Sequence, residues 1–102
     1  MKTKRTKACD ISKKVRDIVW ERDGHGCIIC GSPYAFPNSH FVRRSQNGMG
    51  IPENIVTMCQ RCHMMYDQGP ERELIGAYTE RYLRSQYPDW NKEKLIYKKG
   101  EY

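Results

Sequence analysis

Two short motifs, CIIC at residues 27–30 and CQRC at residues 59–62, decide how this chain folds. Each motif places two residues between its cysteines, and 28 residues separate the first motif from the second. This spacing is typical of two knuckles whose four thiolates surround one Zn²⁺ ion tetrahedrally, with each sulfur about 2.3 Å from the metal. A site made of Cys27, Cys30, Cys59 and Cys62 leaves no open coordination position, so the expected zinc is structural.

The composition explains why such a chain would depend on a metal. It has 102 residues, of which 38% are hydrophobic and 29% are charged, and this predicts one small domain with a thin core. The fifth cysteine, Cys9, is left over and is expected to be an ordinary free thiol. Because the other four cysteines have metal-site spacing, the pattern does not indicate a secreted disulfide framework, and we expect a cytoplasmic protein.

The charge balance favours an anionic partner. Lysine and arginine number 18 against 12 acidic residues, a formal charge of +6, which favours nucleic acid. No apolar run approaches the roughly 20 residues of a membrane span, and the N-terminus lacks the apolar stretch of a secretory signal. Residues 1–9 are polar and basic and are expected to form a flexible arm, with residues 10–102 as one domain.

Apolar spacing predicts an α+β order of elements. From Ile11 onward, apolar residues recur at helical spacing, which predicts an amphipathic helix ending before Gly24. Residues 38–42 and 53–58 are short and compatible with strands, so they predict a hairpin with a long polar tip.

The second half of the chain is expected to be helical. Residues 59–67 lack glycine and proline, so the second knuckle is expected to run into a short helix. A longer helix is predicted between Pro70 and Pro88, followed by a last turn around Leu95 that Asp89 can cap.

Three polar residues give the pattern a specific meaning: His40 in NSHFV, Asn54 in ENIVT, and His63 directly after the second knuckle. Together with the stretch SHFVRRSQNGMGIPENIVTMCQRCHMMYDQG, they resemble the zinc-knuckle form of the HNH (His-Asn-His) endonuclease family. The resemblance covers about residues 26–69 and is greatest to small HNH proteins of phages and prophages. It implies the ββα-metal (His-Me finger) fold, in which a hairpin and a helix are held by a four-cysteine zinc site and flanked by N- and C-terminal helices.

The resemblance implies a role for each of these residues. His40 is the expected general base that deprotonates water, and Asn54 is expected to bridge the hairpin and keep it in register. His63 and Asp67 are four apart on the predicted helix and therefore share one face, where imidazole and carboxylate suit a divalent cation. Mg²⁺ or Mn²⁺ is the expected catalytic ion, with Zn²⁺ or Ni²⁺ as alternatives.

One position departs from the family pattern. Many members carry an acidic residue or a second histidine just before the base, where it binds the metal, and here that position is Ser39. A neutral hydroxyl is a poor ligand for a hard cation. The metal would then rest on His63, Asp67 and waters, or His40 would itself bind it.

Two arginines complete the expected site. Arg43 and Arg44 follow the base closely enough to hold the phosphates that flank a scissile bond. The expected function is metal-dependent hydrolysis of phosphodiester bonds in DNA with low sequence specificity, in the cytoplasm of a bacterial host. The alternatives are a non-catalytic zinc-stabilised module that binds nucleic acid, and an accessory protein of a phage DNA-packaging complex such as a terminase.

Overall fold

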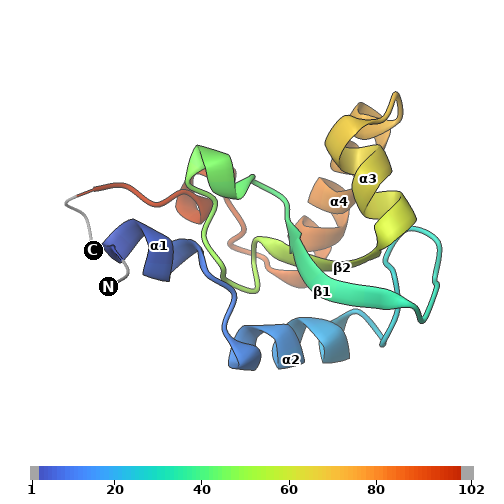
Figure 1. The fold of residues 1–102 in the computed structure, drawn as a ribbon, viewed down its shortest axis with the longest axis horizontal. Helices are drawn as coiled ribbons and strands as arrows, with labels where there is room; N and C mark the ends of the chain where they lie inside the picture. The colour runs from blue at the N-terminus through green and yellow to red at the C-terminus, as the bar shows by residue number, and fades with distance from the viewer. Residues whose placement is uncertain (1–2, 100–102) are drawn as a thin grey trace.

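The computed structural model describes residues 3–99, and it confirms the α+β class. Its elements in chain order are α1 (Lys4–Cys9), α2 (Lys13–Arg22), β1 (Ala35–His40), the 3-10 helix η1 (Arg44–Gln46), β2 (Ile55–Cys59), α3 (Gln60–Gln68), α4 (Arg72–Gln86) and the 3-10 helix η2 (Lys92–Leu95). The two strands form one antiparallel sheet, with α2 against one face and α3 and α4 on the other (Figure 1). Among the described residues, every helix is too short or too polar to span a lipid bilayer.

The pairing of β1 with β2 is irregular at one point, within β1. Its paired residues are Ala35 with Cys59, Phe36 with Met58, Ser39 with Val56 and His40 with Ile55. The register shifts between Phe36 and Ser39, where Pro37 offers no N–H to the ladder. The strand begins at Ala35, earlier than expected from residues 38–42, because the register shift accommodates Pro37 within the strand.

β2 is buried along its whole length. Helices cover both of its faces, so the strand needs no alternation of polar and apolar residues. Beside it lies a buried ion pair: Arg22 Nε donates to Asp23 Oδ1 at 2.8 Å, and the Asp23 side chain is fully buried. The Asp23 carboxylate also accepts from the backbone N–H of Thr57 at 2.7 Å and from the hydroxyl of Tyr82 at 2.5 Å. One carboxylate thus joins α2, β2 and α4.

The N-terminal segment differs from the flexible arm expected over residues 1–9. Lys4–Cys9 is a helix, and the Thr3 side chain caps it by accepting from the N–H of Thr6. Cys9 is fully buried rather than exposed near a loose end. The helix docks because Arg5 finds polar partners on the loop after β1, which the basic composition of the segment did not reveal. Met1 and Lys2 lie outside the described residues.

The C-terminal turn is present where expected, but a different residue caps it. Asn91 accepts from the N–H of Glu93 at 2.9 Å, in place of the expected Asp89. The chain then returns along the loop after β1, where Gly48 and Ile96 form an isolated antiparallel bridge. Figure 1 shows this segment close to α1, at the opposite end of the sheet from the cysteine motifs.

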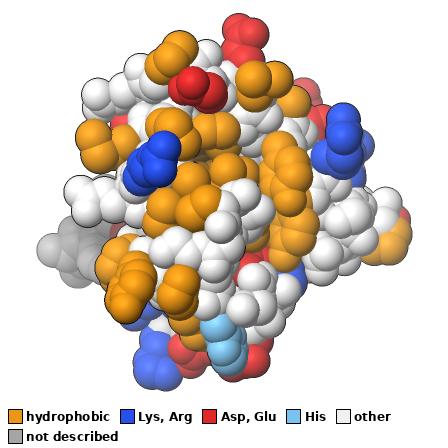
Figure 2. Space-filling model, turned by 90° about the vertical axis from the view of Figure 1, so that its right-hand side faces the viewer, with side chains coloured by type: hydrophobic (Ala, Val, Ile, Leu, Met, Phe, Trp, Pro, Cys, Tyr) orange, Lys and Arg blue, Asp and Glu red, His pale blue; other side chains and the backbone are white. Residues whose placement is uncertain are grey.

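The core is small and continuous with the cysteine cluster. Three of the four paired cysteines are buried among the same apolar side chains as Val56, Leu83 and Trp90. On the face seen in Figure 2, hydrophobic side chains also gather at the surface. The large exposed hydrophobic residues of the described chain include Tyr34, Phe36, Met64, Leu74 and Tyr78. A core of this size is consistent with a fold that requires a metal.

Candidate functional site

The four paired cysteines gather into one cluster. The sulfur atoms of Cys27, Cys30, Cys59 and Cys62 all lie within 4.8 Å of one another. The sulfur atoms of Cys30 and Cys59 are 3.6 Å apart. Tetrahedral zinc with bonds of about 2.3 Å places its sulfurs about 3.8 Å apart. Both the donor chemistry and the spacing therefore fit a structural zinc ion, and the cysteines are positioned as zinc knuckles.

Local backbone geometry explains how each knuckle closes. Gly31 has a φ of +80°, a left-handed conformation that glycine adopts without strain, and its N–H donates to the carbonyl of Cys27 at 2.9 Å. In the second knuckle, Cys59 ends β2 and caps α3, because its sulfur accepts from the N–H of Cys62 at 3.4 Å. The second knuckle is thus the first turn of α3.

The thiols have unequal acidity before a metal binds. Burial opposes ionisation of Cys27, but the backbone N–H groups of Cys30, Cys59 and Ile29 outweigh it and lower the pKa of Cys27 to about 7. Burial and the neighbouring thiols raise the pKa of Cys62. Cys27 therefore ionises more easily than Cys62. A bound divalent cation supplies the positive charge that allows all four cysteines to be thiolates.

A second group of polar side chains lines a pocket beside the end of β1. The pocket has a volume of about 320 Å³ and is lined by Asn38, His40, Arg43, Arg44, Ser45, His63, Tyr66 and Asp67. The structure thus brings together five residues proposed from the sequence, from β1, from the loop that follows it and from α3. The sixth, Asn54, is buried and does not line the pocket.

The ring of His40 has a defined orientation. Its Nε2 lies 3.0 Å from the backbone carbonyl oxygen of Cys9. A carbonyl oxygen only accepts, so Nε2 carries the proton and Nδ1 keeps its lone pair. Burial is the main cause of a lowered pKa for His40, and the positive charge of Arg44 adds to it. At neutral pH this imidazole is uncharged and able to accept a proton.

The ring of His63 is held from the strand. Its Nδ1 lies 2.6 Å from the hydroxyl oxygen of Ser39, and Ser39 is fully buried. When Nδ1 donates to this hydroxyl, Nε2 is left with a lone pair for a ligand.

Asn54 connects the start of β2 to the loop after β1. Its Oδ1 accepts from the N–H of Val42 at 2.7 Å, and its Nδ2 donates to the carbonyls of Val42 at 3.1 Å and Met49 at 2.8 Å. The bridge reaches the backbone just beyond His40 rather than His40 itself.

The two arginines and Asp67 form ion pairs around the pocket. Arg43 Nη2 lies 2.9 Å from the backbone oxygen of Asp67 and 3.5 Å from its Oδ1. Arg44 Nη2 lies 2.5 Å from Oδ1 of Asp10. Asp67 shares a helix face with His63, but its carboxylate faces Arg43.

The same pocket sets limits on a catalytic cation. Within residues 3–99, the four cysteines are the only group of three or more histidine, cysteine or acidic residues whose ligand atoms lie within 4.8 Å of one another. His63 and Asp67 are therefore at most a two-residue donor set, and a cation bound there would keep several waters. Mg²⁺ commonly binds in this way, so the donor set fits a partly hydrated ion.

Sequence reasoning did not identify every residue of the pocket. Tyr66 lines it and donates its hydroxyl to the carbonyl of Phe41 at 2.8 Å. Its position three residues after His63, on the same face of α3, was the available signal. The Cys9 carbonyl is a backbone group in a distant segment, and no pattern of side chains could have indicated it.

Comparison with known families identifies one domain of the chain. The family model described as HNH endonuclease matches residues 27–68. The match runs from the first cysteine of the cluster to the last residue of α3, and includes the hairpin and both histidines. The chain therefore contains an HNH endonuclease domain at these residues, with its cysteines placed as zinc knuckles. No curated protein and no solved structure matches the chain.

The fold and the family agree. A two-stranded antiparallel sheet, flanking helices and a four-cysteine cluster are consistent with the ββα-metal fold of HNH proteins. The matched domain suggests a nuclease-type function and a nucleic-acid substrate.

Proposed function

We propose that this protein is a divalent-metal-dependent DNA endonuclease of low sequence specificity. The observation that carries the proposal is the pocket itself, because an imidazole with a free Nδ1 from β1 and an imidazole from α3 line the same cavity as two arginines. This combination supplies a base, a metal ligand and phosphate-binding groups, which are the requirements for hydrolysing a phosphodiester bond.

His40 is the proposed general base. Its Nδ1 accepts a proton from the attacking water, while the Cys9 carbonyl holds Nε2–H and so fixes the plane of the ring. Burial keeps the pKa of His40 low, so the base is in its neutral form at physiological pH.

His63 and Asp67 are the proposed holders of the catalytic cation. His63 would bind through Nε2 while Ser39 holds Nδ1, and Asp67 would bind through its carboxylate from the same face of α3. When bound, Mg²⁺ or Mn²⁺ stabilises the negative charge that develops on the phosphate and on the leaving oxygen. Imidazole also allows Zn²⁺ or Ni²⁺ at this position.

Arg43 and Arg44 are the proposed phosphate contacts. Both guanidinium groups line the pocket, and each is held by an acidic residue, Asp67 or Asp10. Such pairing fixes the direction of the guanidinium and leaves further N–H donors for phosphate oxygens. Contacts to phosphate carry no base sequence, which is why low specificity is proposed. We place the protein in the cytoplasm, because zinc knuckles need reduced thiols.

A plasmid-nicking assay tests this function. Supercoiled plasmid is incubated with the protein and Mg²⁺, Mn²⁺, Zn²⁺ or Ni²⁺ in turn, and bound zinc is counted on the same preparation. We expect nicking with Mg²⁺ or Mn²⁺, and a loss of about 10²- to 10⁴-fold in His40→Ala. His25→Ala is the matched control, because His25 is exposed and pairs with Glu21 on α2, away from the pocket lining.

The assay also separates the alternatives. His40→Ala must retain zinc and DNA affinity, so that its loss of nicking reports chemistry. If the unmutated protein binds zinc and DNA yet never nicks with any of the four metals, it is a non-catalytic binding module. If it nicks only when bound to a larger protein, such as a phage packaging enzyme, it is an accessory subunit.

A further inference from the structure

We infer that α1 positions a residue of the candidate active site, although it lies outside the segment that matches the family model. Its last residue, Cys9, supplies the carbonyl that positions the proposed base His40. The inference rests on the proposed function, because it assigns a positioning role within that same reaction. α1 is therefore a positioning element and not merely an N-terminal cover.

The carbonyl of Cys9 is available because of where the helix ends. The last four carbonyls of an α-helix have no partner inside the helix. Here the N–H of Asp10 closes the final turn by donating to the carbonyl of Thr6, and the Cys9 carbonyl points to Nε2 of His40 at 3.0 Å. A group that would otherwise need solvent thus orients the imidazole.

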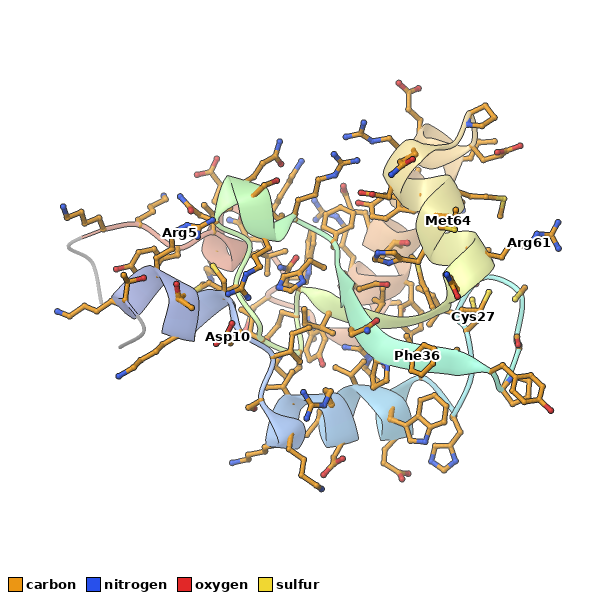
Figure 3. The ribbon with its side chains drawn as sticks, in the orientation of Figure 1. Arg5, Asp10, Cys27, Phe36, Arg61 and Met64 are labelled. Carbon is orange, nitrogen blue, oxygen red and sulfur yellow. The ribbon has the colours of Figure 1, made fainter. Side chains whose placement is uncertain are left out.

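Contacts from α1 hold this carbonyl against the loop that follows His40. Arg5 donates through Nη2 to the carbonyl of Arg44 at 2.7 Å, and through Nε to the side-chain oxygen of Asn47. Asp10 pairs with the guanidinium of Arg44 at 2.5 Å. In Figure 3, Arg5 and Asp10 lie between α1 and this loop. The helix is therefore anchored at both ends.

Gly50 shows how closely the two backbones approach. Its N–H donates to the carbonyl of Ala8 at 2.9 Å. A Cβ added to Gly50 would lie 2.1 Å from the backbone oxygen of Asp10 and 3.1 Å from that of Cys9. A side chain here would clash first with the carbonyl of Asp10 and also crowd that of Cys9, so it would push the backbone at the end of α1 away from the loop and from His40.

The contact matters for chemistry because a neutral imidazole can carry its proton on either nitrogen. A fixed acceptor at Nε2 selects the form in which Nδ1 is free to accept a proton from water. If the acceptor moves away, the second form becomes populated and the ring can rotate, so fewer molecules hold a competent base at any moment. Folding and DNA binding need not change.

Two variants test the inference by different routes. Arg5→Ala removes the anchor of α1, and Lys7→Ala removes the same charge from an exposed position of the same helix and so measures the effect of charge alone. Gly50→Ala displaces the end of α1, and the Cys9 carbonyl with it, through a clash with the backbone of Asp10. For each variant, kcat, DNA affinity, zinc content and the ¹⁵N chemical shifts of the His40 ring are measured in the full-length protein.

In the unmutated protein, we expect Nε2 of His40 to be protonated and Nδ1 to be bare. Arg5→Ala should lower kcat about 10- to 100-fold below Lys7→Ala, with equal DNA affinity and zinc content, and its ring shifts should show a mixture of both tautomers. Gly50→Ala should have the same effect. If Gly50→Ala does not fold, Arg5→Ala alone decides the matter.

The inference is overturned if Arg5→Ala matches Lys7→Ala in kcat and keeps the His40 ring shifts of the unmutated protein. It is also overturned if the unmutated ring carries its proton on Nδ1. The ring shifts need no catalysis, so they give a result even if the protein never cuts DNA. Failure of the nuclease proposal and failure of this inference are therefore distinguishable.

Discussion

The hydroxyl oxygen of Ser39 lies 2.6 Å from Nδ1 of His63, so β1 holds an imidazole that belongs to α3. Ser39 occupies the position before His40 and is fully buried. Its side chain contacts His63 but does not itself line the pocket. A residue that was expected to weaken metal binding therefore has another use, because it can fix the ring through which a cation would be bound.

We expect Ser39→Ala to weaken binding of the catalytic cation about 10- to 100-fold, because groups that orient a ligating histidine have effects of this size. The measurement is a Mn²⁺ titration followed by calorimetry and by nicking rate. Ser85→Ala, at an exposed position of α4, is the control. Equal Mn²⁺ affinity in Ser39→Ala and the unmutated protein would contradict this role for Ser39.

The pH dependence of nicking follows from the lowered pKa of His40. The base works only when neutral, and burial lowers its pKa below the ordinary value. Acidification should therefore abolish kcat/KM only when the pH falls below about 6.5, the usual pKa of histidine. A pH–rate profile, with an NMR titration of the His40 ring beside it, checks this. An acidic limb centred above 7 would assign the limb to another group.

Removal of zinc should unfold the protein. Structural zinc contributes about 10–16 kcal/mol in small zinc domains, which is comparable to the whole stability of a domain, about 5–15 kcal/mol. We therefore expect Cys59→Ala, or a strong chelator, to abolish the helical circular dichroism signal. Cys9→Ala should retain about one zinc ion per chain, since Cys9 lies outside the four-sulfur cluster. A metal-free protein with an unchanged melting curve would refute this expectation.

Asn54→Ala should destabilise the fold by about 2–4 kcal/mol, because it leaves buried backbone groups of Val42 and Met49 without partners. Urea denaturation measures the change. Asn54→Asp is an informative companion, since a carboxylate can still accept from the N–H of Val42 but cannot donate to the two carbonyls. If both variants unfold at the same urea concentration as the unmutated protein, the Asn54 bridge does not stabilise the fold.

Much of the fold could be predicted because its signals are local. Ser12 directly precedes α2 and caps it by accepting from the N–H of Val15, which is a local signal of a helix start. The two cysteine pairs are close in sequence within each knuckle, so their spacing alone indicated the cluster. Pro70 and Pro88 indicated the two ends of the longer helix. The register shift at Pro37 could not be predicted, because it depends on how β2 pairs with β1.

The candidate site was predictable only in its side chains. The order of His40, Asn54 and His63 in the sequence indicated the candidate site residues, and the pocket contains both histidines. The orientation of each ring depends on groups that a linear pattern does not connect, the carbonyl of Cys9 and the hydroxyl of Ser39. Tertiary contacts of this kind arise only once the helix and the hairpin have packed together.

Cys59 combines two duties, since its sulfur belongs to the four-thiol cluster and also caps α3. Peroxide would convert such a thiolate to a sulfenic acid, and one chemical event would then release an ion and fray the helix that carries His63. Cys59 itself is buried, whereas Cys30 is the exposed member of the cluster, so an oxidant would reach the cluster through Cys30. Release of the ion would then also free the sulfur that caps α3, and recovery would require both a reductant and a fresh supply of zinc.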